Sequence, residues 1–306
     1  IITIALMLFT GYLMTRITRK FKLPNVTGYI LAGILMGPYC LDMVPVKVID
    51  GMDFLSDIAL AFIAFSTGEF FRFSVLKKNG WKVVVITVME AVLASVCVFA
   101  VVYGVLHLNL PFSIVLAALA SATAPASTIM TIRQTGAKGD FVDTLLQVVA
   151  LDDVVGLVEY SAAISIALAA LSGGGFQVGN ILKPIFVNGA VLVLGGIFGW
   201  LLKCMMPKKK YKDNRLIISV AALFAFCGIC SLADVSPLLG CMSMGTIYIN
   251  LSDDDKLFKQ LNYFSPPILL LFFVRSGLSF RLDALLNPSA GEDGASLLVI
   301  GVAYFL

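Results

Sequence analysis

Charged residues are scarce in this sequence. Asp, Glu, Lys and Arg make up 13% of the 306 residues, whereas a soluble domain typically carries about 25%. Hydrophobic residues account for 59%, and the mean hydropathy is +0.96. This composition excludes an ordinary soluble domain and predicts an all-α polytopic membrane protein.

The residues that most catalytic and metal sites need are also scarce. His107 is the only histidine, and the six cysteines lie in or beside apolar segments, which indicates buried packing thiols. No nucleophile–base set, metal-ligand set or nucleic-acid-binding motif is visible. We therefore expect neither an enzyme, nor a bound cofactor, nor a nucleic-acid partner.

Long apolar runs set the architecture, because a membrane-spanning helix needs about 20 apolar residues. Eleven segments fit, and the chain begins and ends within apolar runs, so we expect both ends to be cut. The predicted segments are 1–17, 25–41, 54–71, 82–106, 112–132, 140–171, 183–206, 214–232, 235–250, 260–280 and 294–306, the last of them incomplete.

Lys and Arg residues predict the orientation of these segments. The loops after the first, third, fifth, seventh and ninth segments hold 18 of the 22 basic residues. The alternate loops hold only Lys47, Lys183 and Arg281. Because basic loops face the cytoplasm, we expect a multi-pass protein of the cell membrane with its N-terminus outside and lipid as its neighbour.

Two pairs of neighbouring segments repeat along the chain. Gly33 in "GYILAGILMG" matches Gly245 in "GCMSMG", and "STGEFFRFSVL" (66–76) matches "RSGLSFRLDAL" (275–285) without a gap. The copies lie seven segments apart, and an odd separation means that the second copy is inverted in the membrane. Inverted repeats are typical of secondary transporters, whose sites lie near the midplane at the repeat interface.

The segment 112–132 holds the first candidate site. Hydroxyl residues, among them Thr123 and Ser127, surround Pro125, and a proline inside a helix removes a hydrogen bond and clashes with the carbonyl four residues back. We expect the helix to break here at mid-membrane, where irregular backbone must line a cavity or be buried in protein. The freed carbonyl and hydroxyl oxygens suit a small cation; a packed proline kink is the alternative.

Asp152 and Asp153 form the second candidate site, within the apolar stretch "VVALDDVVGLVEY" (148–160). Each costs about 2.5–3.5 kcal/mol at a helix centre, and such residues usually mark ion or proton pathways. Their mutual repulsion favours a bound proton or a bound cation. One carboxylate hardly holds a proton and a cation together, and this competition is sufficient to couple a proton flux to a cation flux. A static salt bridge or a helix cap is the alternative.

Four other charged residues of the apolar segments are candidates for a role. Glu159 follows Asp152 by seven residues, on nearly the same helix face, where it lines the same aqueous path or sits near the outer interface. Glu90 is expected to pair with a polar neighbour, and its function is open. Glu69 and Arg275 lie near the ends of repeat-related segments, and a structural ion pair explains Arg275 better than substrate contact.

These residues resemble the cation/proton antiporter superfamily, in particular its bacterial sodium (or potassium)/proton antiporters. The resemblance covers essentially the whole chain. It rests on "LPNVTGYILAGILMGP" (23–38), "LLLFFVRSGLSF" (269–280) and, above all, "SATAPASTIMTIRQTGAKGDFVDTLLQVVALDDVVG" (121–156). It implies an inverted-repeat antiporter fold with crossed broken helices and about thirteen transmembrane helices, eleven of them in this sequence.

The resemblance also implies roles for individual residues. Asp153 carries the cation or the proton, and Asp152 is its partner. A Glu at the end of the third helix contributes in some relatives, which makes Glu69 a secondary candidate beside Glu159 and Arg275. The transported ions are Na⁺ or K⁺, with Li⁺ able to replace Na⁺, and H⁺. Supporting coordination is expected from the broken helix, at Thr123, Ala124, Pro125 and Ser127.

The resemblance further implies a homodimer in which the core slides like an elevator. The dimerisation domain would comprise 1–80 and 207–285, and 183–206 would be a linker helix. The mobile core would comprise 81–171 and 294–306, the latter incomplete. A regulatory region would follow Leu306.

Two departures from the family bear on the site. Many relatives carry Thr-Asp-Pro where this chain has Thr-Ala-Pro, so Ala124 supplies no carboxylate to the helix crossing. The basic residue that pairs with the first aspartate, and the second crossing helix, would lie beyond Leu306.

A chain that ends at Leu306 is therefore expected not to exchange ions, because part of its ion site is missing. Cation-driven proton flux by such a chain in proteoliposomes would contradict this expectation.

Two other classes stay open. An organic-anion sodium symporter of the bile-acid type has a similar crossed-helix architecture, but the adjacent aspartates argue against it. A non-transporting membrane sensor could keep the same fold. Replacing Asp153 with Asn in the complete protein separates these classes from an antiporter.

Overall fold

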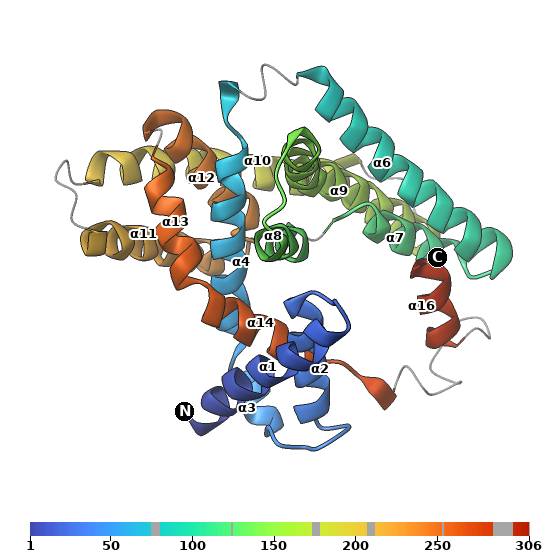
Figure 1. Cartoon of the computed structure of the whole chain (residues 1–306). Helices are drawn as coiled ribbons and strands as arrows, with labels where there is room; N and C mark the ends of the chain where they lie inside the picture. Colours follow the sequence, from blue (N-terminus) through green and yellow to red (C-terminus); the bar gives the residue numbers. More distant parts are fainter. Residues whose placement is uncertain are drawn as a thin grey trace. The chain divides into compact units, whose positions relative to one another are not determined.

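The computed structural model describes residues 1–74, 80–123, 125–172, 178–206, 212–252, 254–283 and 296–305, and every regular element in these ranges is helical (Figure 1). The prediction of an all-α protein is therefore confirmed. The elements are α1 (Ile2–Lys20), α2 (Asn25–Met36), α3 (Val46–Asp50), α4 (Asp53–Thr67), η1 (Gly68–Phe70), α6 (Trp81–Phe99), η2 (Ala100–Val105), α7 (Leu110–Ala120), α8 (Pro125–Thr135), α9 (Asp140–Ser172), α10 (Val178–Met205), α11 (Lys212–Leu232), α12 (Leu238–Ser252), α13 (Asp255–Phe264), α14 (Pro266–Leu278) and α16 (Leu297–Phe305).

Several of these helices can cross a membrane. Within the described ranges, three helical segments are long and apolar enough: Trp81–Val105 (α6 with η2), Ile185–Met205 in α10 and Asn214–Leu232 in α11. The bent pair α13 and α14 is a fourth if it counts as one span. Large apolar side chains such as Phe9 and Leu93 are exposed, as expected of helices that face lipid.

The chain divides into two compact units. Unit 1 contains α1 to α4, η1, α8, α11 to α14 and the second half of α10, and unit 2 contains α6, η2, α7, most of α9, and α16. The predicted dimerisation, linker and core domains remain predictions. The units comprise Ile1–Val75, Pro125–Asp143 and Val191–Phe280 (unit 1), and Leu76–Ala124, Thr144–Ala190 and Arg281–Leu306 (unit 2).

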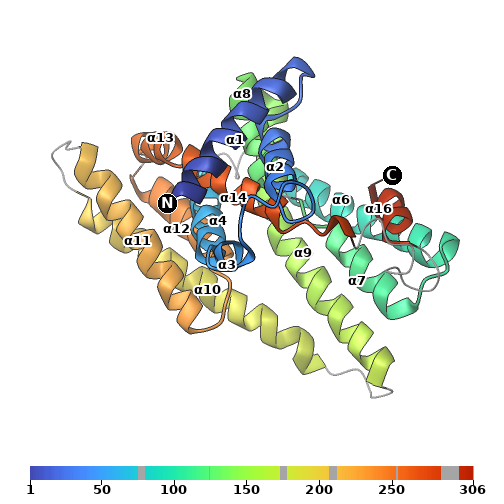
Figure 2. The ribbon, with the colours of Figure 1, turned by 90° about the horizontal axis from the view of Figure 1, so that it is seen from below.

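Helices α2 and α14 meet backbone to backbone in unit 1 (Figures 1 and 2). A Cβ atom at Gly33 would lie 2.0 Å from the carbonyl oxygen of Val274, and one at Gly277 would lie 2.2 Å from the carbonyl oxygen of Ile30. No side chain fits in that space. Small residues at a helix crossing let the backbones approach, which is a common way to pack membrane helices.

Helices α4 and α12 make the equivalent crossing through η1. A Cβ atom at Gly245 would lie 2.2 Å from the carbonyl oxygen of Phe65, and one at Gly68 would lie 2.5 Å from the backbone nitrogen of Thr246. The repeat pairs Gly33 with Gly245 and Gly68 with Gly277. The internal repeat therefore relates each crossing to the other, as an inverted internal symmetry requires.

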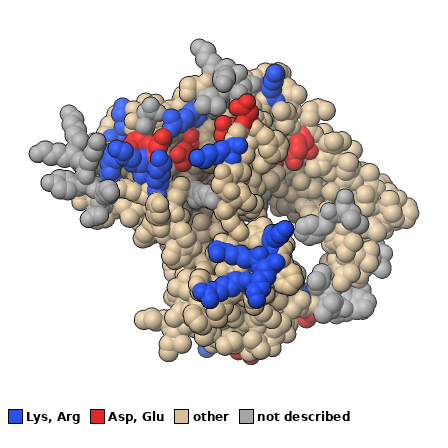
Figure 3. All heavy atoms as spheres, in the orientation of Figure 1, with Lys and Arg blue, Asp and Glu red and all other residues tan. Residues whose placement is uncertain are grey.

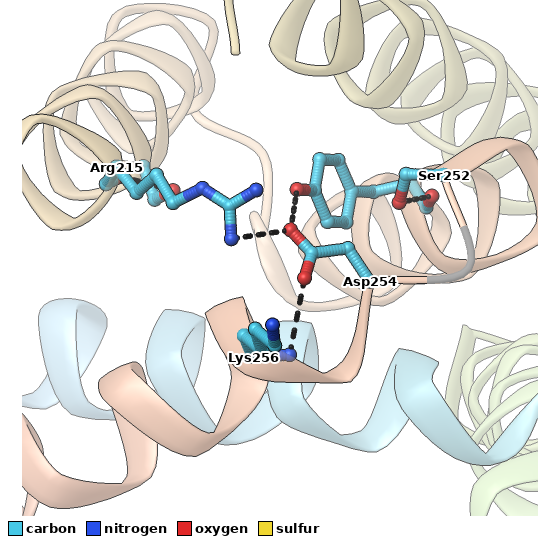
Figure 4. A network of polar contacts seen from close by, with 6 residues as sticks. Arg215, Ser252, Asp254 and Lys256 are labelled. Atoms are coloured by element: carbon cyan, nitrogen blue, oxygen red, sulfur yellow. Dashed lines mark hydrogen bonds and ion pairs between the residues drawn. The ribbon is translucent and has the colours of Figure 1, made fainter. Parts of the chain in front are cut away.

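Ion pairs join three basic loops at one end of unit 1, and Figure 4 shows the pair between Arg215 and Asp254. Arg215, near the start of α11, lies 2.9 Å from a carboxylate oxygen of Asp254, whose other oxygen accepts a hydrogen bond of 3.2 Å from the backbone N–H of Lys256. Arg72, just after η1, pairs with Asp255. Figure 3 shows Lys and Arg gathered over this end and over the turn between α1 and α2. The joined loops are among those that the sequence assigns to the cytoplasmic side.

One predicted helix is divided in the structure. The sequence predicts a single helix over 260–280, whereas α13 and α14 meet at Ser265 with a bend of 51°. Pro266 and Pro267 open α14. A proline has no N–H to donate and its fixed φ favours the first helical turn, so this pair begins a helix rather than continuing one.

The glycine crossings predict that Gly33→Ala and Gly245→Ala each destabilise the complete protein by about 1–3 kcal/mol, the usual cost of overpacking. Gly228→Ala in α11 is the matched control, because a Cβ atom there would meet nothing within 4 Å. Thermal unfolding in detergent measures the effect. Equal melting temperatures for all three variants would contradict the close-packed crossings.

Candidate functional site

The predicted break at Pro125 is present in the structure. Helix α7 ends at Ala120, and α8 begins at Pro125. The Ser121 hydroxyl donates to the carbonyl oxygen of Ala118 at 2.8 Å, and the last backbone bonds of α7 join residues three apart, so the final turn tightens and stops. Thr123 follows the helix in non-helical backbone. Ala124 lies outside the described residues, as does the side chain of Pro125.

Asp152 accepts a hydrogen bond from Thr123 inside unit 2. The distance from the Thr123 hydroxyl to Oδ2 of Asp152 is 2.5 Å, and Asp152 is fully buried. The second oxygen, Oδ1, is also buried and has no hydrogen-bond partner among the described residues. A buried carboxylate with a free oxygen is costly in an apolar helix, and it is therefore open to a proton or to a cation.

A glycine in α9 lets the broken helix approach Asp152. Gly156 lies one helical turn after Asp152, and a Cβ atom there would be 3.3 Å from Cβ of Ala122 and 3.4 Å from Oγ of Ser121. A larger side chain at this position would press on the loop that carries Thr123. Glycine at position 156 therefore eases the contact between α9 and this loop.

Glu159 continues the same face of α9, as the sequence predicts. Its carboxylate accepts a hydrogen bond of 2.7 Å from the Ser95 hydroxyl of α6. The two residues border a pocket whose other walls are apolar and come from α6, α7 and α9. Polar groups therefore follow this face for two helical turns.

The structure does not bring every candidate together. The side chain of Asp153 lies outside the described residues, although its backbone belongs to α9. Ser127 is partly buried in α8 of unit 1, and Glu69 lies in η1 of the same unit. Arg275 also belongs to unit 1.

Arg275 has partners that account for its charge within unit 1. Its guanidinium pairs with Asp53 and donates to the Ser56 hydroxyl at 2.9 Å and to the carbonyl oxygen of Ile49 at 3.4 Å. These contacts tie α14 to the start of α4. They support the structural ion pair that the sequence favours.

Sequence reasoning missed two neighbours of the acidic residues. The Glu90 carboxyl group of α6 lies within hydrogen-bonding reach of the Asp152 carboxyl group, and Ser95 bonds Glu159. The available signal was the presence of polar residues in the apolar segment 82–106. Which helix those residues face cannot be read from that signal.

The arrangement provides hard oxygen ligands without a compensating cation. Within the described ranges, neither Asp152 nor Glu159 forms an ion pair with Lys or Arg. Carboxylate and hydroxyl oxygens suit small hard cations. A broken helix beside a buried aspartate is the arrangement in which secondary transporters bind their ions.

The comparison with known proteins agrees with this arrangement. The model of the transmembrane sodium/hydrogen exchanger family matches residues 4–306. The chain therefore belongs to the sodium/hydrogen exchanger family, and its resemblance to the cation/proton antiporter superfamily is confirmed.

Two relatives show how much of a complete protein the chain represents. The iron transporter MagA of Paramagnetospirillum magneticum is 23% identical over 277 residues, which are 88% of this chain and 60% of that protein. The Na(+)/H(+) antiporter 1 of Methanocaldococcus jannaschii is 27% identical over 202 residues, which are 60% of this chain and 46% of that protein. The chain thus spans between 46% and 60% of the length of these relatives.

Solved structures share the fold. Two structures of the sodium proton antiporter MjNhaP1 from Methanocaldococcus jannaschii superpose with TM-scores of 0.68 and 0.73 at 21% identity. The match covers 93% of this chain and about 70% of theirs. The predicted antiporter fold is therefore confirmed.

The contact between Thr123 and Asp152 makes a specific prediction. Thr123→Val removes the donor and leaves a buried carboxylate oxygen unpaired, which should destabilise the complete protein by about 1.5–3 kcal/mol. Thr123→Ser keeps the hydroxyl and should stay near wild type. Thermal unfolding measures both variants, and a Thr123→Val variant as stable as wild type would show that the hydroxyl does not contribute.

Proposed function

We propose that the complete protein exchanges a monovalent cation, Na⁺ or K⁺, for protons across the membrane. The observation that carries this proposal is the buried Asp152, held on one oxygen by Thr123 at a helix break, in a member of the sodium/hydrogen exchanger family. The names of the Methanocaldococcus jannaschii relative and of the matching solved structures agree with it.

Competition between a proton and a cation couples the two fluxes. Asp153 is the carrier, and Asp152 is its partner at the broken helix. A carboxylate that has taken up a proton has lost most of its attraction for a cation, so the site carries one or the other. The hydroxyl of Thr123 and the carbonyl oxygens of the break would complete the coordination of a cation at this site.

Transport follows alternating access of the elevator type. The core, 81–171 with 294–306, moves against the dimerisation domain, 1–80 with 207–285. One observation supports a rigid partner: the glycine crossings, which lie in the predicted dimerisation domain, leave no room for sliding.

The protein works as a homodimer in the cell membrane with its N-terminus outside. The orientation rests on the distribution of basic residues, 18 of 22 in alternate loops. The homodimer rests on the family alone.

Asp153→Asn in the complete protein should abolish cation-driven proton flux, because an amide neither binds a proton at neutral pH nor neutralises a cation. The measurement uses proteoliposomes with Na⁺, K⁺ or Li⁺ on one side, with and without a clamped membrane potential. Met89→Leu, an exposed position in α6, is the control and should exchange as wild type does.

Unchanged exchange by Asp153→Asn would refute its role. An organic-anion symporter would show no cation-driven proton flux in wild type, and its organic-anion uptake would depend on sodium. A non-transporting sensor would show neither flux.

A further inference from the structure

We propose that Glu90, in the middle of α6, is a further ligand of the transported cation, which it holds together with Asp152. This inference rests on the proposed exchange function and adds a residue from a third helical element to the site. The carboxylates of Glu90 and Asp152 would then form a pair in unit 2, in which Thr123 already donates to one oxygen of Asp152.

Glu90 occupies a position that a charged residue rarely takes without a function. It is the ninth residue after the start of α6 at Trp81, inside the apolar span Trp81–Val105. Lys82 is the only other Asp, Glu, Lys or Arg in that span. It lies eight residues away, about 12 Å along the helix axis, so it does not neutralise Glu90. Ionisable residues inside membrane segments usually mark an ion path.

The neighbour of Glu90 is another acid. Its carboxyl group lies within hydrogen-bonding reach of the Asp152 carboxyl group. Two ionised carboxylates have only acceptor oxygens, so they repel at this separation unless something positive lies between them. Within the described ranges, neither forms an ion pair with Lys or Arg.

One carboxylate oxygen of Asp152 has no hydrogen-bond partner among the described residues. Oδ2 of Asp152 is taken by Thr123, whereas Oδ1 is buried and without a hydrogen-bond partner among the described residues. A small cation between Glu90 and Asp152 would use that oxygen and would remove the repulsion. Carboxylate oxygens are the ligands that such cations prefer.

Accessibility distinguishes the two carboxylates. Asp152 is fully buried, whereas Glu90 is exposed on unit 2. Glu159, the next acid along the face, is less suited because it already accepts the Ser95 hydroxyl.

Glu90→Gln tests this assignment in the complete purified protein. It should raise the half-saturating concentration of Na⁺, K⁺ or Li⁺ for proton exchange at a fixed pH by about 10- to 100-fold, the usual cost of losing a supporting group at a metal site. Glu90→Asp keeps a carboxylate and should show a smaller increase. Met89→Leu, at the adjacent exposed position, should bind cations as wild type does.

Cation-dependent thermal stabilisation provides a second readout that does not require transport. A ligand stabilises the folded state according to its concentration relative to its dissociation constant. Glu90→Gln removes the repulsion from Asp152, so it should not lower the melting temperature of the cation-free protein, but it should need a correspondingly higher cation concentration to gain stability. A purely structural role would instead lower the cation-free melting temperature and leave the concentration dependence unchanged.

The outcomes separate this inference from the proposed function. If wild type shows neither exchange nor cation-dependent stabilisation, the proposed function fails. If wild type shows both and Glu90→Gln has the same cation dependence, only the role of Glu90 is overturned. If Glu90→Gln does not fold, the comparison of Glu90→Asp with wild type decides, and an unchanged cation dependence in Glu90→Asp would overturn the role.

Discussion

The cost of burying the Asp152 carboxylate in an apolar helix is the constraint on which the site depends. An ionised group without partners is strongly disfavoured in such surroundings, and the local structure answers that cost in steps. The break after α7 exposes Thr123, whose hydroxyl takes one oxygen, and Gly156 lets the broken segment come close enough to do so. In the proposed exchange, the other oxygen takes up a proton or a cation, and the remaining cost becomes the driving force for that binding.

The two units solve different physical problems. In unit 1 the helices meet at Gly33 with Gly277 and at Gly68 with Gly245, where backbone touches backbone and no side chain can be added. Such packing resists deformation. In unit 2 the polar groups cluster around a helix interruption, where the backbone does not form regular helical hydrogen bonds. In the proposed exchange, the glycine crossings would belong to the rigid part of the transporter and the helix interruption to its ion-binding part.

Much of the fold could be predicted from the sequence because hydropathy and proline act locally. The apolar runs gave the helices, and Pro125 gave the break, since both effects depend on neighbours within a few residues. The bend at Ser265 was missed because the apolar run continues through Pro266 and Pro267 and hides a helix start. The contacts of Glu90 with Asp152 and of Ser95 with Glu159 depend on which faces of distant helices meet. Periodicity in one helix carries no information about that.

The proposed exchange requires that a proton and a cation compete for the same aspartates. The most direct test counts the protons released into a weakly buffered solution when Na⁺ or K⁺ is added to the complete purified protein at constant pH. Competition predicts a saturable release of protons that follows cation binding and that disappears when Asp153 is replaced by Asn. Cation binding without proton release would contradict this competition.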